Sequence, residues 1–286
     1  MTVSIPQDLL FFCLLCALIG LIVGSFLNVV ILRLPRMLEQ TSRQEYYEKE
    51  VPSPKTGASI SLSRPRSYCP HCSQSIKPWH NIPLISWVLL LGKCAHCGVS
   101  ISIRYPLVEI VTSALSAATA YKFGFGPECF SALILIWILI ALIGIDIDTQ
   151  LLPDNLTMPL LWSGLGCNIF AIWTTLPSAV LGAMLGYLSL WSVYWLFKLA
   201  TGKEGIGYGD FKLLAALGAW FGWQAIPLMI LLSSSVGAIL GVTILLIRQQ
   251  DSDTPLPFGP YLGGTGILML FFGDNLITGY LGLIGL

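Results

Sequence analysis

Charged residues are scarce in this sequence. Only 10% of its 286 residues are Asp, Glu, Lys or Arg, whereas about 25% is usual for a soluble domain. A surface so poor in charge is not suited to water, which excludes an ordinary soluble globular protein. Lys and Arg are also absent from the first eight residues, and the apolar run that follows is too long for the core of a signal peptide. We therefore expect this first apolar run to be retained as a helix.

Apolar residues make up 55% of the chain and gather in long runs. A membrane-spanning helix needs about 20 apolar residues to cross about 30 Å of hydrocarbon. Eight runs approach that length: residues 9–32, 106–123, 129–145, 156–173, 179–199, 211–223, 225–247 and 261–286. The sixth run is short and the second contains Glu109, so these two fit least well. We predict an all-α polytopic membrane protein with about eight transmembrane helices.

The positive residues define a topology. Ten of the 15 Lys and Arg lie within residues 33–104. With eight crossings, this segment shares a side with the connections near residues 147–155, 201–210 and 248–258, which brings 14 of the 15 together. By the positive-inside rule this side is cytoplasmic, and both termini are expected outside.

One polar insertion separates the first apolar run from the other seven. Residues 37–61 have mixed charge and are interrupted by Pro52, Pro54 and Gly57, which is typical of a mobile surface linker. Residues 68–104 instead combine cysteines, tryptophans and short apolar stretches. We expect a small compact module here, on the cytoplasmic side between the first and second helices.

Four cysteines of this module form two C-x-x-C pairs with 21 residues between them: Cys69, Cys72, Cys94 and Cys97. Each pair presents two thiolates from one tight turn, and two turns complete the four-sulfur shell that Zn²⁺ favours in structural sites. Gly98 follows the second pair, where such a turn often needs a positive φ. We predict a structural zinc ion, since a closed shell leaves no open position for catalysis.

Disulfides are the alternative for these cysteines, but thiols on the cytoplasmic side stay reduced. His71 and His96 lie inside the pairs and could compete as ligands, although four thiolates already close the shell. The other four cysteines fall in or beside apolar runs and are interpreted as packing residues: Cys13, Cys16, Cys129 and Cys167.

Acidic residues cluster at two of the expected membrane boundaries. Asp146, Asp148 and Asp154 follow the third apolar run, and Asp210 ends a G-x-G-D motif that begins at Gly207 and precedes the sixth. Both clusters fall on the cytoplasmic side of the predicted topology, so they could meet. Ionisable groups at such positions are costly and often functional. The alternative for any one of them is a helix cap facing water.

Two carboxylates that share a site cannot both ionise easily, so the pair can hold one proton near neutral pH. An aspartyl protease uses this state: the ionised partner takes a proton from the attacking water, and the protonated partner hydrogen-bonds the scissile carbonyl. Glycines at positions 205, 207 and 209 suit a loop that approaches an extended substrate closely.

Taken together, these motifs resemble the type IV prepilin peptidases, leader peptidases and N-methyltransferases related to the GxGD group of aspartyl proteases. The resemblance covers nearly the whole chain: residues 24–35, both cysteine pairs, and residues 101–109, 146–154, 207–212 and 257–260. It implies a bacterial inner-membrane enzyme that cleaves prepilins or type II secretion pseudopilins after a Gly at the cytoplasmic face. The new N-terminal residue, often Phe, is then methylated with S-adenosylmethionine.

The resemblance also implies roles for individual residues. Asp146 and Asp210 match the catalytic pair, with Asp148 as the alternative to Asp146. The supporting residues are Asp148, Asp154, Gly207, Gly209 and Lys212. Surplus acids, including Glu204, could meet the basic leader, although a solvated face explains them equally well. Residues 257–260 are interpreted as a helix start in preference to a lining of the substrate path.

Methyl transfer is less visible, since no Gly-rich nucleotide loop follows a strand. By resemblance this activity belongs to residues 1–105, and the peptidase to residues 106–286. The candidates for donor binding are Gly24, Ser25, Asn28 and Glu109, although the first three equally fit close helix packing, as Gly20 does.

Two other classes of function remain open. A transporter also carries acids near helix ends, and it would depend on a transmembrane gradient. A non-enzymatic assembly factor would use the zinc module for docking and the helices as an anchor. No nucleic-acid partner is expected, and the sequence does not define an oligomeric state.

Overall fold

The computed structural model describes residues 7–50, 61–203, 205, 207–248 and 257–283. The chain divides into two compact units, Met1–Phe125 and Gly126–Leu286, here called the N-terminal and C-terminal units. The described residues form helices and short turns, with two isolated β-bridges and no longer strand. This confirms the all-α class. The boundary between the two units lies after the second predicted helix, at residues 125–126. The functional division predicted from the resemblance lies before that helix, at residues 105–106.

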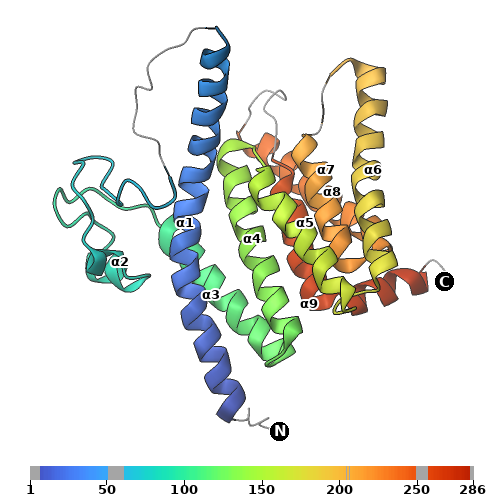
Figure 1. The fold of residues 1–286 in the computed structure, drawn as a ribbon, viewed down its shortest axis with the longest axis horizontal. Coiled ribbons are helices and arrows are strands. Elements are labelled where there is room, and N and C mark those ends of the chain that lie inside the picture. The colour runs from blue at the N-terminus through green and yellow to red at the C-terminus, as the bar shows by residue number, and fades with distance from the viewer. Residues whose placement is uncertain (1–6, 51–60, 204, 206, 249–256, 284–286) are drawn as a thin grey trace. The chain divides into compact units, whose positions relative to one another are not determined.

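The N-terminal unit is built on two long helices, α1 (Gln7–Glu50) and α3 (Arg104–Phe123), which pack against each other (Figure 1). Small residues allow this close approach. A Cβ added at Gly20 would lie 2.8 Å from the Cα of Ser113, and one at Gly24 would lie 2.8 Å from the Cα of Glu109. The packing role that the spacing of these glycines predicted is therefore present.

In the sequence, the cysteine module connects these two helices. Its only helical elements among the described residues are η1 (Pro78–Asn81) and α2 (Ile85–Leu89). One prediction about the preceding segment was wrong. Helix α1 continues to Glu50, so residues 37–50 are helical and are not a linker. The physical reason is that this stretch contains no Gly or Pro, and the first helix breaker after Pro35 is Pro52. Residues 51–60 lie outside the described part of the chain.

The C-terminal unit is a helical bundle in the order α4 (Pro127–Thr149), α5 (Asp154–Ile169), α6 (Leu176–Thr201), α7 (Tyr208–Phe221), η2 (Trp223–Ala225), α8 (Ile226–Arg248) and α9 (Gly259–Leu283). Helix α7 is almost wholly buried and contacts α5, α6 and α9 (Figure 1). Its backbone lies directly against α6, since a Cβ at Gly186 would come within 2.6 Å of the Leu214 carbonyl oxygen. The helix that carries Asp210 is thus the centre of the bundle.

Each of the eight predicted apolar runs overlaps one α-helix of the described residues. Within the described residues, four helices are long and apolar enough to cross a membrane alone: Gln7–Ser42, Pro127–Thr149, Leu176–Thr201 and Trp223–Thr243. Helices α5 and α7 have 16 and 14 residues, which at about 1.5 Å per residue is shorter than a bilayer core of about 30 Å. A membrane protein is supported, and the count of about eight crossings stays a prediction.

Candidate active site

Asp146 lies in the last turn of α4 and is buried, with 4% of its surface exposed. Its carboxylate accepts a hydrogen bond from the backbone N–H of Gly259, with 3.0 Å between Gly259 N and Asp146 Oδ2. Gly259 is the first residue of α9. The first N–H of that helix and its positive dipole end therefore face the carboxylate, which stabilises its ionised form.

Asp210 lies in the first turn of α7 and is also buried, with 8% exposed. Its carboxylate is hydrogen-bonded by the backbone of Gly207. Its Oδ1 atom is the one buried side-chain oxygen or nitrogen in the described residues that has no hydrogen-bond partner. Leaving such an atom unsatisfied costs about 1–3 kcal/mol, so it is suited to bind a water or a substrate group.

The two acids are near neighbours although they are 64 positions apart. The charge of Asp146 acts on Asp210 by direct Coulombic repulsion. Leu152, in the connection after α4, marks the same meeting point. A Cβ at Gly209 would lie 2.7 Å from the Leu152 Cβ, and a Cβ at Gly259 would lie 3.1 Å from its Cδ2. The ends of α4, α7 and α9 thus converge around one pair of carboxylates.

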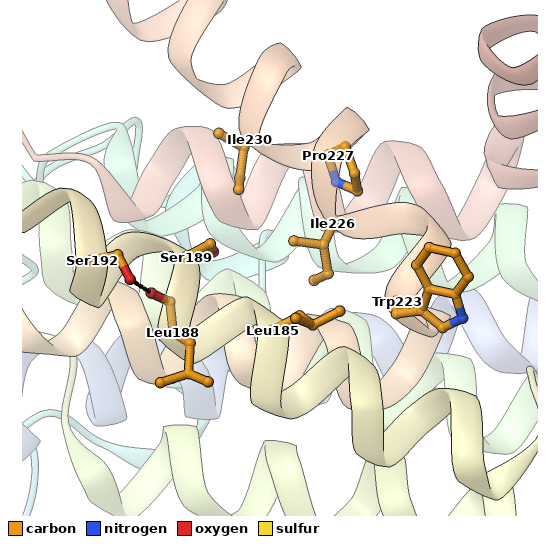
Figure 2. Close-up of a pocket in the computed structure, with 8 residues that line it drawn as sticks. All are labelled: Leu185, Leu188, Ser189, Ser192, Trp223, Ile226, Pro227 and Ile230. Atoms are coloured by element: carbon orange, nitrogen blue, oxygen red, sulfur yellow. Dashed lines mark hydrogen bonds between the residues drawn. The ribbon is translucent and has the colours of Figure 1, made fainter. Parts of the chain in front are cut away.

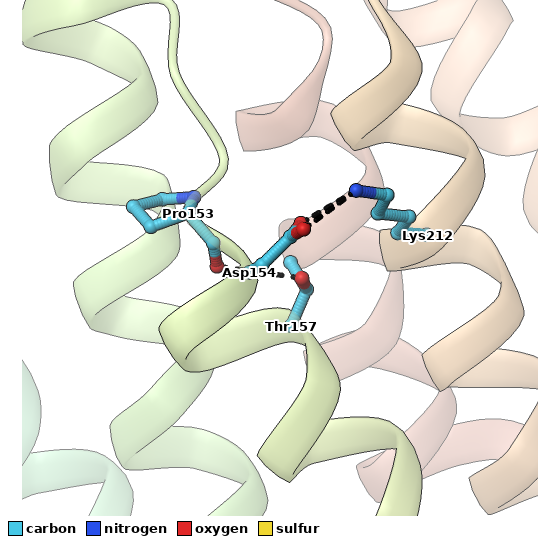
Figure 3. Close-up of polar contacts among 4 residues, drawn as sticks. All are labelled: Pro153, Asp154, Thr157 and Lys212. Carbon is cyan, nitrogen blue, oxygen red and sulfur yellow. Dashed lines mark hydrogen bonds and ion pairs between the residues drawn. The ribbon is translucent and has the colours of Figure 1, made fainter. Parts of the chain in front are cut away.

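The other acids of the first cluster lie in different surroundings. Asp148 is exposed, only two residues after the buried Asp146. Asp154 starts α5 and forms an ion pair with Lys212 of α7, with Nζ to oxygen distances of 2.7 and 2.8 Å (Figure 3). Asp154 is 58% exposed, so this pair contributes about 0–1 kcal/mol. The ion pair connects the start of α5 to the start of α7, which carries Asp210. Glu204 lies outside the described residues.

Of the two glycines of the G-x-G-D motif, only Gly209 is required by packing. Gly207 has a φ of −77°, which any residue can adopt, and it precedes α7. Gly209 is held against Leu152, where a side chain would clash. We expected these glycines to admit a substrate backbone, and their contacts in the structure are with Asp210 and Leu152.

Sequence reasoning missed the role of Gly259. Residues 257–260 were interpreted as a helix start, which is correct, but the first N–H of that helix also bonds Asp146. A Cβ at Gly259 would lie 2.7 Å from Asp146 Oδ2, so only glycine fits here without a shift. The available signal was a Gly between Phe258 and Pro260, directly before an apolar run.

The four cysteines of the N-terminal unit come together as predicted. Their sulfur atoms all lie within 4.8 Å of one another, and the Cys69 and Cys97 sulfurs are 3.8 Å apart. A tetrahedral zinc ion with Zn–S bonds of about 2.3 Å requires sulfur separations of about 3.8 Å. The cluster therefore fits zinc. His71 and His96 are not part of it.

The two cysteine turns share one geometry. Ser73 N donates to the Cys69 carbonyl and Gly98 N to the Cys94 carbonyl, each at 2.9 Å. Both donors have a positive φ, 57° at Ser73 and 69° at Gly98, as predicted for Gly98. Backbone hydrogen bonds from Cys97 and His96 lower the pKa of the Cys94 thiol to about 6. These bonds favour the thiolate of Cys94, which is the form that binds metal. At Cys97 in the same turn the backbone hydrogen bond from Val99 lowers the pKa, but burial and the neighbouring cysteine thiols raise it to about 11.

The residues considered for methyl transfer gather where α1 packs on α3. Glu109 is buried, and its Oε2 accepts a hydrogen bond from the Leu84 N–H of the cysteine module at 2.7 Å. Ser25 hydrogen-bonds the same carboxylate. Asn28 Nδ2 donates to the Tyr105 carbonyl at 3.0 Å. Gly24 has no polar side chain and contacts Glu109 by packing.

An apolar groove of about 550 Å³ lies between α6 and α8 of the C-terminal unit (Figure 2). Its polar side chains are Ser189 and Ser192, and both hydroxyls are bonded to carbonyls of their own helix. No acid or other titratable group lines it. The groove is therefore separate from the aspartate site.

Comparisons with known proteins cover both units. Residues 18–123 match the bacterial peptidase A24 N-terminal domain, and residues 133–242 match the type IV leader peptidase family. A prepilin leader peptidase/N-methyltransferase of Stutzerimonas stutzeri is 55% identical over 93% of each chain. Proteins of the same name from Pseudomonas aeruginosa and Xanthomonas campestris pv. campestris are 54% and 48% identical, over 96% and 94% of this chain and 95% and 94% of theirs. No solved structure shows significant similarity to the chain.

Proposed function

Because this chain belongs to the type IV leader peptidase family, we propose that it removes the leader of type IV prepilins with Asp146 and Asp210, and then methylates the new N-terminal amine. Zinc and S-adenosylmethionine are its cofactors, the first structural and the second the methyl donor. The observation that carries the peptidase assignment is the pair of buried carboxylates, one bonded by a helix N-terminus and one with an unpartnered oxygen.

The pair performs the hydrolysis with one shared proton. The ionised carboxylate takes a proton from water as the water attacks the scissile carbonyl carbon. The protonated carboxylate donates its hydrogen bond to the carbonyl oxygen, where negative charge develops. The amine of the mature pilin then leaves with a proton from the pair. Asp148 is the weaker candidate for the first acid because it is exposed, whereas Asp146 is buried beside Asp210.

The substrate is positioned by the membrane. A prepilin carries its own apolar helix, which leaves the Gly–Phe junction at the surface of the bilayer, so the enzyme gains proximity without a deep specificity pocket. Asp146 lies near the end of one helix and Asp210 near the start of another, next to connections that the sequence predicts to share one side with 14 of the 15 Lys and Arg. We place the site and the zinc module on the cytoplasmic face, and type II pseudopilins among the substrates.

The test is Asp210→Asn, which changes charge but little volume. We expect leader removal from a synthetic prepilin to fall at least about 1000-fold, within the range of lost acid–base catalysis. Zinc content, thermal stability and methylation of an already cleaved pilin peptide should stay unchanged. Mass spectrometry of the peptide reports both reactions. The matched control is Asp274→Asn, an exposed acid of the same unit.

The same experiment separates this function from its two rivals. A transporter or an assembly factor would release no leader peptide from the purified wild-type protein in detergent, where there is no gradient and no partner. Leader removal by the Asp210→Asn variant at the wild-type rate would refute the assignment of the catalytic pair.

A further inference from the structure

Glu109 is a buried carboxylate that the peptide cleavage does not use. It lies in the second turn of α3 with 7% of its surface exposed. Its two hydrogen-bond partners, the Leu84 N–H and Ser25, are both neutral. Among the described residues it forms no ion pair. Burying a charge without an opposite charge is expensive, and such a group in a membrane protein marks a functional site.

The surrounding structure holds this carboxylate in place. Leu84 has a φ of 60° and a ψ of −50°, a conformation that costs a non-glycine residue of order 1–3 kcal/mol. That strained backbone aims its N–H at Glu109 at 2.7 Å. On the opposite side, the close contact of Gly24 with the Glu109 backbone brings Ser25 within hydrogen-bonding reach. The geometry fixes one acid between the module and two helices.

A small cavity opens one helical turn away. It has a volume of about 130 Å³ and is lined by Asn28, Ile31, Leu32, Ser102, Arg104 and Tyr105. Tyr105 lies four residues before Glu109 on α3, and Asn28 lies three residues after Ser25 on α1. The cavity is smaller than the roughly 300 Å³ or more of a complete small-molecule site. It is large enough for one end of a ligand.

We propose that Glu109 binds the N-terminal ammonium that leader cleavage releases and accepts its proton when the amine is methylated. This inference rests on the proposed function and assigns the methyl acceptor a binding group. An ammonium is the cation that a buried carboxylate with two neutral partners would take, and an amine must lose a proton before it can attack carbon.

The reaction balances with the groups present and the methyl donor. The ammonium gives one proton to the Glu109 carboxylate, and the nitrogen lone pair forms a bond to the methyl carbon of the sulfonium. The bond between that carbon and sulfur breaks, and its electron pair stays on sulfur, which leaves a neutral thioether. The product is a methylammonium, and Glu109 passes the proton to water.

The donor's sulfonium is the less suitable partner for this acid. Its positive charge disappears from sulfur as the methyl group is transferred, so a carboxylate beside it would stabilise the reactant more than the transition state. Placed beside the amine, the same carboxylate favours the reaction, because it removes the proton that would otherwise prevent the nitrogen from attacking the methyl carbon. We therefore assign the contact to the acceptor.

The experiment compares wild-type protein with Glu109→Gln on a synthetic pilin peptide that already begins with Phe, in the presence of S-adenosylmethionine. Gln keeps an oxygen that can accept the Leu84 N–H. We expect methylation by the variant to fall at least about 100-fold at pH 7. The control is Glu39→Gln, which changes an exposed acid on α1. Leader cleavage, zinc content and S-adenosylmethionine binding by equilibrium dialysis should match wild type.

A pH profile separates the proposed role from a structural one. The variant must use amine that has already lost its proton, so its residual rate should rise about tenfold per pH unit until the amine pKa of about 8. Wild type should change little over the same range. An equal loss at every pH, or loss of S-adenosylmethionine binding, would overturn the proposal. If wild-type protein methylates no peptide, the proposed function fails and this assignment fails with it.

Discussion

The cysteine cluster and the aspartate pair differ in how completely the protein provides partners for their side-chain atoms. The four cysteines of the N-terminal unit come from two short turns with matching backbone hydrogen bonds, and their sulfurs form a closed set within 4.8 Å of one another. Asp146 and Asp210 come from separate helices, and one oxygen of Asp210 has no partner in the described residues. A closed set stabilises a fold, whereas a site with one open position can bind a reactant.

The largest effect should separate Asp146 from its exposed neighbour. Asp146→Asn keeps an oxygen for the Gly259 N–H but cannot accept a proton from water, so leader cleavage should fall at least about 1000-fold. Asp148→Asn alters an exposed carboxylate, and its rate should stay within about threefold of wild type. Both rates are measured by mass spectrometry on the same prepilin peptide.

The comparison between the two clusters fails if this order is reversed. Strong loss in Asp148→Asn together with near wild-type cleavage in Asp146→Asn would mean that the buried pair is not the reacting pair. Equal thermal stability of both variants is the control for folding.

The second prediction concerns the closed cluster. Cys94→Ser removes one of four ligands, and we expect zinc measured by plasma mass spectrometry to fall from one ion per chain to less than about a tenth of that value. Because metal binding in such modules is largely folding free energy, the module should also lose protection from proteolysis. Cys13→Ser, a cysteine of the same unit outside the cluster, should leave zinc unchanged.

The rate of leader cleavage by Cys94→Ser shows whether the aspartate pair depends on the cysteine cluster. The C-terminal unit carries both aspartates and the Gly259 N–H, so Cys94→Ser should cleave within a few-fold of wild type. A loss of cleavage as large as that of Asp146→Asn would show that zinc and the aspartates form one functional unit, not two independent sites.

The contrast also explains what the sequence could predict. The cysteine site was predictable because each pair is local and its spacing requires a tight turn. The helices were predictable from apolar runs, and the meeting of Asp146 and Asp210 from topology and resemblance. The prediction of a linker at residues 37–50 is wrong because mixed charge does not break a helix: the stretch contains no Gly or Pro, and Glu, Lys and Arg are good helix formers.

Apart from the aspartate pair, contacts between distant segments could not be predicted. Gly259 and Asp146 are 113 positions apart, and nothing in either local pattern specifies that one donates to the other. The same holds for Leu84 and Glu109, where a strained backbone in the module meets a helix. Such pairs depend on how helices pack, and periodicity describes only which face of a helix is apolar.

The smallest predicted effect tests the geometry around the open site. Gly259→Ala would place a Cβ 2.7 Å from Asp146 Oδ2 and 3.1 Å from its Cγ, so the carboxylate or the helix start must move by a few tenths of an ångström. A misplacement of that size should lower the rate of leader cleavage about tenfold, with little change in the Michaelis constant. Gly264→Ala is the matched control. Gly264 lies on the same helix, and a Cβ added there would meet no atom within 4 Å. If both variants cleave equally, the N-terminus of α9 does not position Asp146, and the hydrogen bond from Gly259 has only a structural role.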